Sequence, residues 1–281
     1  MSVNISLSEV AVAPLVPGYV RAEGGVHVDF ALTPRGTAPA RIGESGGHRV
    51  RFPKGGACEA VLINTGGGMA GGDRMSVGIR LAEDAAAVVT TQSAEKIYRA
   101  QRAATEIAVS LNLAGGSRLA WLPQEAILFS ESRVRREVNI ALAADASLIF
   151  AESVVFGRAA MGETMQRACF RDRWRVRRDG ALVFAEDVRL GGDIHQLLAR
   201  KAIGDGARAL ATVLVVAPDA EARIDTGRAA LADAQSQCGA SAWNGMLLAR
   251  FLSRNAQALR ADLVRFLEWL SGRPMPRSWQ T

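Results

Sequence analysis

From about residue 26 to residue 190, apolar and polar residues alternate over short runs that break at glycine or aspartate. Side chains on one face of a β-strand recur at every second residue, whereas those on one face of a helix recur near every 3.6 residues. The clearest apolar sets follow the period of two: Met75, Val77, Ile79 and Leu81; Ile107, Val109, Leu111 and Leu113; and Val138, Ile140 and Leu142. The pattern therefore predicts a mostly β body of short strands.

Helical signals appear only toward the C-terminus. Because the strand runs are not separated by amphipathic stretches of about ten residues, βαβ crossovers and a doubly wound sheet are not expected. The predicted helices are Asp193 to Ala202, a weaker one over Asp219 to Ala234 that Gly227 interrupts, and Ser253 to Leu270 with Ser253 as N-cap and Gly272 beyond its end. We expect the apolar stripe of the last helix to pack on the β body, with a partner-binding helix as the alternative.

The domain organisation follows from what the chain lacks. It has no linker rich in proline, glycine or serine, and no close internal repeat. We therefore expect a single domain over residues 1–281, in which residues 1–20 form a flexible N-terminal stretch. This opening stretch does not resemble a secretory signal, and no uncharged apolar run approaches the roughly 20 residues that cross a bilayer. A soluble, cytoplasmic protein is expected.

The net charge and the cysteine content say little about the function of the protein. The net charge of +6 comes almost entirely from arginine, since only three lysines are present. Such an excess suits an acidic partner, but with so much alanine it is better explained by a GC-rich genome. Three widely separated cysteines form no Cys-x-x-Cys pair, which fits a reducing compartment.

The segment from Asn64 to Asp73 contains the spacing Gly-x-Gly-x-x-Gly at Gly66, Gly68 and Gly71. This dinucleotide-binding fingerprint works only where the last glycine opens a helix, yet here an alternating strand pattern follows. The Lys-Ser/Thr of a P-loop is also missing after the last glycine. The segment is better explained as a glycine-rich connection where backbones approach closely.

Sites for metals or catalysis are not visible from residue spacing. His27, His48 and His195 are scattered, and no Cys/His cluster suggests a tight zinc or nickel site. Any metal contact must be weak, assembled from distant carboxylates, or shared with another chain. There is no Gly-x-Ser-x-Gly nucleophile motif, so no catalytic residue and no tightly bound cofactor are expected.

A ladder of arginines is the other unusual feature. Arg171, Arg173, Arg175 and Arg177 fall on one face of a strand that an Asp179-Gly180 turn joins to Ala181 to Glu186, because Asp-Gly suits a type I′ hairpin turn. A two-residue turn would place Arg173 opposite Glu186, and Arg175 and Arg177 opposite Phe184 and Leu182. The ladder is either a solvated face or a surface for an acidic protein. RNA is less favoured, because Trp174 points to the other face and few aromatics are interleaved.

Five segments resemble the signatures of the UreD (UreH) family of urease accessory proteins, and they occur in the family's order. They are Asn64 to Asp73, Thr91 to Arg99, Trp121 to Glu125, Gly157-Arg158 with Met161 to Glu163, and Arg277 to Trp279. The family's motif positions include Gly66, Gly67, Gly71, Gly72, Lys96 and Arg99. The resemblance covers the chain from about residue 20 to its end.

The resemblance implies a β-helix-like fold of stacked strands with a few helices near the C-terminus. It implies a non-enzymatic chaperone that binds UreF and, through it, the GTPase UreG, and that helps deliver nickel to the urease apoprotein. Neither nucleic acid nor a membrane is implied as a partner. The motif acids Asp73, Glu95, Glu125 and Glu163 are then candidates for a weak nickel path. Equally, each acid could cap a turn or pair with an arginine such as Arg74 or Arg158.

Two rival assignments follow from the residues alone. One is an arginine-rich RNA-binding β protein, and the other, less favoured, is a dinucleotide-dependent enzyme.

Overall fold

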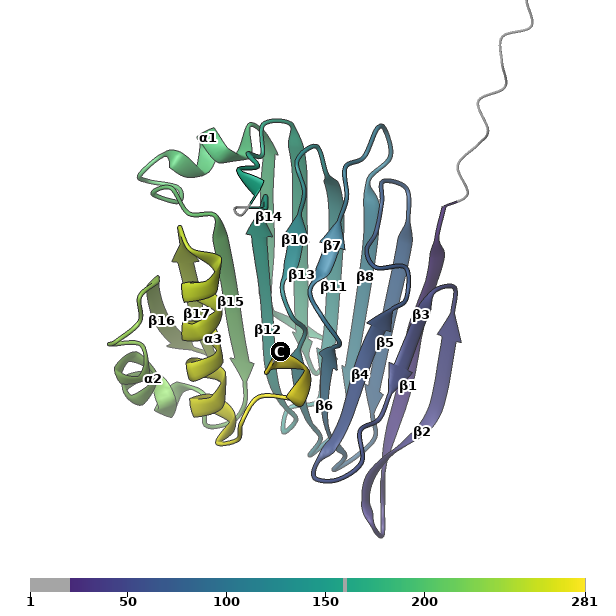
Figure 1. The fold of residues 1–281 in the computed structure, drawn as a ribbon. Helices are drawn as coiled ribbons and strands as arrows, with labels where there is room; N and C mark the ends of the chain where they lie inside the picture. The colour runs from purple at the N-terminus through teal and green to yellow at the C-terminus, as the bar shows by residue number, and fades with distance from the viewer. Residues whose placement is uncertain (1–20, 159–160, 281) are drawn as a thin grey trace, which may run out of the picture.

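Two stacked β-sheets form the body of the protein in the computed structural model, which describes residues 21–158 and 161–280 (Figure 1). The predicted flexible stretch, residues 1–20, lies outside the described residues. Sheet A has the strand order β14-β13-β11-β8-β5-β1-β2, and sheet B runs β16-β17-β15-β12-β9-β6-β4-β3, with β10 and β7 attached beside β12.

The strands of sheet A are β1 (Glu23–Thr33), β2 (Gly36–Ser45), β5 (Arg74–Leu81), β8 (Thr105–Leu113), β11 (Arg133–Leu142), β13 (Ala168–Arg178) and β14 (Ala181–Gly192). Those of sheet B are β3 (His48–Arg51), β4 (Cys58–Asn64), β6 (Ala86–Thr91), β7 (Glu95–Ile97), β9 (Arg118–Leu122), β10 (Ala126–Leu128), β12 (Ser147–Phe156), β15 (Ala209–Val216), β16 (Gln237–Trp243) and β17 (Met246–Ser253). The prediction of a mostly β protein is confirmed.

The middle of the chain coils between the two sheets. It passes from β4 in sheet B to β5 in sheet A, then back to β6, and continues in this way through β8, β9, β11 and β12 to β13. Each strand pairs in parallel with the previous strand of its own sheet, as β5 does with β8 and β6 does with β9. Parallel strands usually need helical crossovers, but here the opposite sheet supplies the return. The result is a β-solenoid-like stack, as the family resemblance implies.

The alternation of apolar residues matches this packing. The three predicted sets on β5, β8 and β11 point between the sheets, where for example Ile79 and Leu111 have no exposed surface, although Met75 is only partly buried. The outward positions of the same strands are exposed or half-buried. Since each Leu, Ile or Phe removed from water contributes about 1.5–3 kcal/mol, this inter-sheet core holds the coil together.

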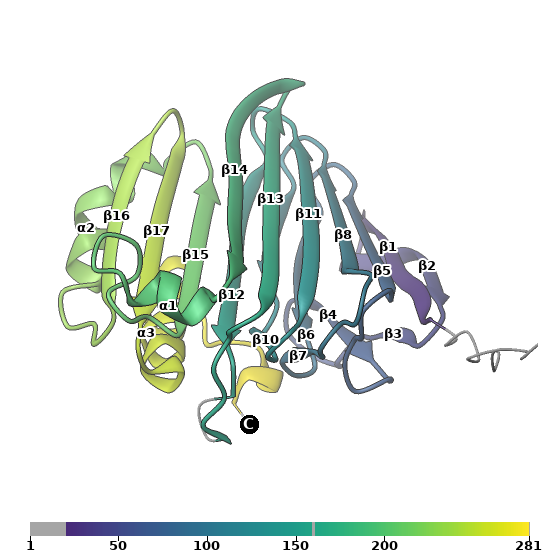
Figure 2. The ribbon, with the colours of Figure 1, turned by 90° about the horizontal axis from the view of Figure 1, so that it is seen from above.

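A second core lies on the other face of sheet B, where α3 (Ala256–Ser271) packs on β15 and β17 (Figure 2). The apolar stripe of α3 serves this core: Leu263 and Phe266 are buried there. The predicted N-cap is wrong, because the side chain of Asn255, not Ser253, accepts the N–H groups of Gln257 and Ala258. Strand β17 keeps Ser253 in the sheet and delays the start of the helix. Gly272 ends the helix at a φ of 62°, as expected.

Shorter helices flank this second core. The predicted helix after Asp193 exists as α1 (Ile194–Ala199), with Asp193 as N-cap. The weaker predicted helix is split into η2 (Glu221–Arg223) and α2 (Ile224–Ala230). Gly227 does not interrupt it, since it lies inside α2, where an added Cβ would come within 3.2 Å of the Trp269 ring. A final turn, η3 (Arg277–Trp279), lies on the outer face of sheet B.

The β13–β14 hairpin forms around Asp179 and Gly180, whose φ angles of 48° and 79° fit the predicted type I′ turn. Arg177 lies opposite Leu182 as expected. A bulge then shifts the register, so that Arg175 faces Ala185, and Arg173 faces Asp187. The predicted pairings of Arg173 with Glu186 and of Arg175 with Phe184 are therefore wrong, because a turn type cannot report an extra residue further along the strand.

Candidate functional site

The five motif segments meet around the short strands β7 and β10, which attach beside β12 in sheet B. The glycine-rich segment lies against β7: Met69 N–H donates to the Lys96 carbonyl at 2.8 Å, and Tyr98 N–H donates to the Met69 carbonyl at 2.8 Å. The Tyr98 hydroxyl also donates to the Gly67 carbonyl at 2.8 Å. Segments that are separate in sequence thus form one structural unit, called here the motif cluster.

Two glycines of the cluster allow close approach of backbones. An added Cβ at Gly68 would come within 2.7 Å of the Lys96 carbonyl oxygen, and one at Gly71 within 2.4 Å of the Ala100 Cβ. After Gly72 the chain enters β5, where the dinucleotide fingerprint requires a helix. The interpretation of this segment as a close-packed connection is confirmed.

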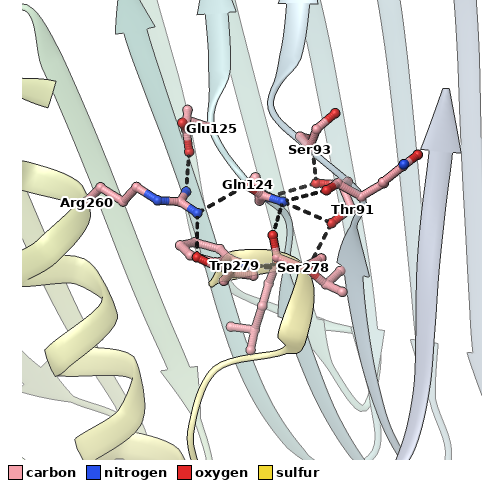
Figure 3. A network of polar contacts seen from close by, with 10 residues as sticks. Thr91, Ser93, Gln124, Glu125, Arg260, Ser278 and Trp279 are labelled. Carbon is pink, nitrogen blue, oxygen red and sulfur yellow. Dashed lines mark hydrogen bonds and ion pairs between the residues drawn. The ribbon is translucent and has the colours of Figure 1, made fainter. Parts of the chain in front are cut away.

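The C-terminal turn joins the cluster from the outer face of sheet B (Figure 3). The side-chain amide of Gln124 donates to the carbonyls of Thr91, Gln92 and Ser278. The indole N–H of Trp279 donates to Thr90 Oγ1 at 3.0 Å and to the Leu122 carbonyl at 3.1 Å. The Arg277–Trp279 motif therefore fastens the chain end to β6 and β9.

Arg260 on α3 closes this network. Its guanidinium donates to Glu125 Oε2 at 2.7 Å, to Gln124 Oε1 at 3.1 Å and to the Trp279 carbonyl at 3.0 Å (Figure 3). It also lies 4.6 Å from the centre of the Trp279 ring, within cation–π range. Glu125 is thus an ion-pair partner that orients Arg260.

The described residues of the fourth motif segment are tied to one another and to Ser130, just beyond β10. The Glu163 carboxylate accepts the N–H groups of Ser130 and Arg158 and two bonds from the Arg158 guanidinium. The side-chain bonds from Arg158 lead the effects that lower the pKa of Glu163. Arg158 in turn lies 4.2 Å from the Phe129 ring centre. Glu163 therefore fixes Arg158 beside Ser130.

An interior cavity of about 140 Å³ opens behind the motif cluster, between the two sheets. Its lining includes Asn64, Gly68 and Glu95 from the cluster, together with His48 and Glu152. Apolar side chains of β5 and β8 supply much of the remaining wall. The cavity thus places a few polar groups among apolar walls, the usual composition of a small-ligand site.

Glu95 is the motif acid that lines this cavity. Its Oε1 accepts a 2.9 Å bond from the Asn64 side-chain amide. Burial raises the pKa of Glu95 to about 7, and the Asn64 bond opposes this only in part. Glu95 can therefore exchange a proton near neutral pH, and when ionised it offers a carboxylate oxygen to the cavity.

A buried charge cluster of Arg136, Asp172 and Glu152 lies at the cavity wall. Arg136 binds Asp172 through two parallel bonds of 2.9 and 2.6 Å, and its third nitrogen binds Glu152. Glu152 also accepts the Trp121 indole N–H at 2.9 Å. Burial raises the pKa of Glu152, although Arg136 counteracts the effect. Two carboxylates thus share one arginine in the interior.

His48 is the buried imidazole of the cavity wall. It is 6% exposed, and neither ring nitrogen has a hydrogen-bond partner among the described residues. Burial lowers the pKa of His48, and the nearby Arg49 adds to the effect. A neutral imidazole keeps one nitrogen lone pair available to a metal or a proton.

The four predicted metal-path acids thus have different surroundings. Asp73 is buried, and its two oxygens accept the N–H groups of Ala22 and Ala70. Glu125 and Glu163 pair with arginines, and only Glu95 of the four lines the cavity. Within residues 21–158 and 161–280, no group of three or more His, Cys, Asp or Glu side chains could hold a metal ion.

The buried charge cluster was not predicted, although the sequence carries a signal for it. Arg136 lies between Val134 and Val138 in the core-facing phase of its strand. Asp172 and Glu152 likewise occupy core-facing positions of β13 and β12. A charged residue in the apolar phase of a strand needs a buried partner of opposite charge. Three such residues on the consecutive strands β11, β12 and β13 therefore indicate that their side chains pair in the core.

The sequence as a whole matches one family of known proteins. The family model described as UreD urease accessory protein matches residues 22–280. Urease accessory protein UreD 3 of Methylorubrum extorquens (strain PA1) is 48% identical over 284 residues, which cover 96% of this chain and 95% of the relative. Urease accessory protein UreD of Rhodopseudomonas palustris (strain ATCC BAA-98 / CGA009) is 47% identical, with 98% and 94% covered. Among the described residues, no helix is long and apolar enough to span a membrane.

Proposed function

The chain belongs to the UreD family of urease accessory proteins, and we propose that it works in urease maturation as a non-enzymatic scaffold that passes nickel to the urease apoprotein. The observation that carries the proposal is the family match over residues 22–280, and three of the five motif segments (Asn64 to Asp73, Thr91 to Arg99 and Trp121 to Glu125) supply residues to the lining of the interior cavity.

The proposed partners are UreF and, through it, UreG, together with the urease subunits. GTP hydrolysis is assigned to UreG, because the one nucleotide-like motif of this chain is a close-packed connection between strands. The proposed setting is the cytoplasm. No tightly bound cofactor is part of the proposal, and nickel is cargo that binds only in passing.

Nickel is proposed to pass through the cavity, with Glu95 as its first carboxylate ligand. His48 lines the same cavity and offers an imidazole nitrogen, whereas the two oxygens of Glu152 are already bound by Trp121 and Arg136. Such borderline and hard donors suit a divalent first-row metal, and few ligands at each step let the ion leave again. Asp73, Glu125 and Glu163 are proposed to support the walls, because their oxygens already accept N–H groups or pair with arginines.

Complementation tests the proposal. A urease operon that lacks its own UreD gene is expressed with this chain, and urease activity, urease nickel and the proteins that co-purify with the tagged chain are measured. The proposal predicts active, nickel-loaded urease and recovery of UreF, UreG and urease with the chain. Retention of the chain by RNA with a steep salt slope, or stabilisation by a dinucleotide, in place of these results would favour a rival assignment.

A further inference from the structure

The outer face of sheet A, opposite the interior cavity, presents the arginine ladder to solvent. Figure 2 shows that α2, α3 and the C-terminal turn lie on the side of sheet B and not on this face of sheet A. Its outward side chains alternate with the buried ones along β5, β8, β11 and β13. The face is therefore open across the middle of the sheet.

Part of the ladder is neutralised. Arg171 pairs with Asp187 at 3.2 Å, and Arg173 lies 3.7 Å from Glu137. Arg189 and Arg171 together hold the pKa of Asp187 well below its usual range. Arg175 donates to two backbone carbonyls, those of Trp174 and Glu186. This end of the face is therefore an internally paired network.

The row of cross-strand pairs that begins at Arg177 has arginines without such partners. It crosses the sheet to Arg80 on β5 and ends at Arg41 on β2, with Asp29 of β1 between Arg80 and Arg41. No carboxylate of the described residues lies within ion-pair distance of these three arginines. Even with Asp29 counted, the row carries a net positive charge that no ion pair within residues 21–158 and 161–280 neutralises.

A groove of about 400 Å³, called here the outer groove, lies in this row. It is lined by His27, Asp29, Arg41, Gly43, Gly78, Arg80, Ser110 and Asn112. The His27 imidazole lies over Gly78, where an added Cβ would come within 2.3 Å of the His27 Nδ1. The groove thus brings the guanidinium groups of Arg41 and Arg80 together with the polar side chains of Ser110 and Asn112.

The chemistry of the outer groove favours protein carboxylates over nucleic acid. Arginine forks bind carboxylates and phosphates alike through paired N–H groups. Single-stranded nucleic acid also needs aromatic platforms for its bases, and the groove lining contains no Phe, Tyr or Trp, its one aromatic ring being the imidazole of His27. The aromatic side chains on the ladder strand, Phe170 and Trp174, are 2% and 3% exposed and face the core.

We propose that the outer groove docks an acidic segment of a partner protein, with Arg41 and Arg80 as its carboxylate-binding residues and Arg177 extending the positive row. The inference rests on the proposed function only for the choice of partner proteins to be tested. Docking there leaves the motif cluster and the interior cavity free, because sheet A lies between them and the groove.

The test compares Arg41→Glu/Arg80→Glu with Arg200→Glu/Lys201→Glu, which changes the charge by the same amount in the turn after α1. Each tagged chain is co-expressed with UreF, UreG and the urease subunits, purified at two salt concentrations, and checked for an unchanged unfolding midpoint. We expect the groove variant to lose one partner by at least about tenfold, corresponding to about 1.4 kcal/mol, and the control variant to lose none. Wild-type recovery of that partner should fall as salt rises.

Three results separate the alternatives. Equal recovery of every partner by wild-type chain and groove variant overturns the inference while leaving the proposed function intact. A groove variant that loses only retention on polyuridine RNA also overturns it, because nucleic acid is then the ligand. Failure of the wild-type chain to recover any of these partners counts against the proposed function. In that case the wild-type chain and the groove variant are compared for binding of polyglutamate. An equal affinity of the two for polyglutamate overturns the inference.

Discussion

The Asn64 side-chain amide lies 2.9 Å from Glu95 Oε1, and this bond joins the glycine-rich connection to the strand that borders the interior cavity. It links two motif segments that are 31 residues apart in the chain. Because the bond stabilises the ionised carboxylate, it limits the effect of burial, which nevertheless raises the pKa of Glu95 to about 7. Glu95 therefore has a measurable pH signature.

Glu95→Gln should stabilise the protein at pH 8 but not at pH 4.5. The folded chain retains the Glu95 proton up to about pH 7, whereas the unfolded chain releases it near 4.5, so wild-type stability falls as pH rises through this window. The variant avoids that loss and should gain up to about 3 kcal/mol in unfolding free energy at pH 8. Urea unfolding at several pH values measures the difference. Glu83→Gln, at an exposed turn, is the control, and a gain for Glu95→Gln that is the same at both pH values would contradict the account.

Arg136→Met should destabilise the protein by about 3–5 kcal/mol, because it leaves Asp172 and Glu152 buried without their cation. Arg135→Met is the matched control one residue away: its side chain is 54% exposed and lies 3.6 Å from Glu106. That control should change stability by less than about 1 kcal/mol. Denaturant titration of both variants decides the matter, and equal effects would mean that the interior charge cluster is not held as described.

Trp279 offers a graded test of the C-terminal turn. Trp279→Phe keeps a large ring but removes the N–H shared by Thr90 and Leu122, and should cost about 1 kcal/mol. Trp279→Ala also removes a buried ring and should cost about 3–5 kcal/mol. Gln280→Ala at the next, exposed position controls for changes at the chain end. If all three variants unfold at the same urea concentration, the turn does not stabilise sheet B.

Asp73→Asn should act on stability and not on metal transfer. Its two carboxylate oxygens accept the N–H groups of Ala22 and Ala70, and an amide can replace only one of them as acceptor. A loss of about 1–3 kcal/mol is expected, measured by thermal or urea unfolding. Glu95→Gln provides the contrast at neutral pH, because it keeps an oxygen for Asn64. If Asp73→Asn leaves the stability unchanged but lowers the nickel content of urease, Asp73 is a nickel ligand and not only a structural residue.

The sequence predicts much of the fold because the period of two is a property of each strand alone. It showed which residues of β5, β8 and β11 face the core, and where α1 and α3 occur. It could not show which strands are neighbours, since alternation specifies a face and not a partner. The register of Arg173 was missed for a related reason: one bulged residue on β14 shifts every pair beyond it.

The site was predicted only as a set of separate motifs. Their order suggested the family, but their convergence around β7 and β10 depends on the coiling of the chain, which spacing does not encode. Of the four acids chosen from these motifs, Glu95 alone lines the cavity. The carboxylates of the other three have partners elsewhere: Arg260 binds Glu125, Arg158 binds Glu163, and backbone N–H groups bind Asp73. His48 and Arg136 belong to no motif; Arg136 carries a signal in the core-facing phase of its strand, whereas His48 is identified only by its burial.

The most direct test of the account is the nickel content of urease matured with Glu95→Ala in a cell that lacks its own UreD gene, measured by elemental analysis of the purified urease. Recovery of the complex with UreF, UreG and urease is measured in the same cultures, with wild type and Glu83→Ala as controls. The account predicts that both controls restore nickel-loaded urease, whereas Glu95→Ala assembles the complex in full yet leaves the urease depleted of nickel. Wild-type nickel content with Glu95→Ala, or a nickel loss that only follows loss of the complex, would contradict it.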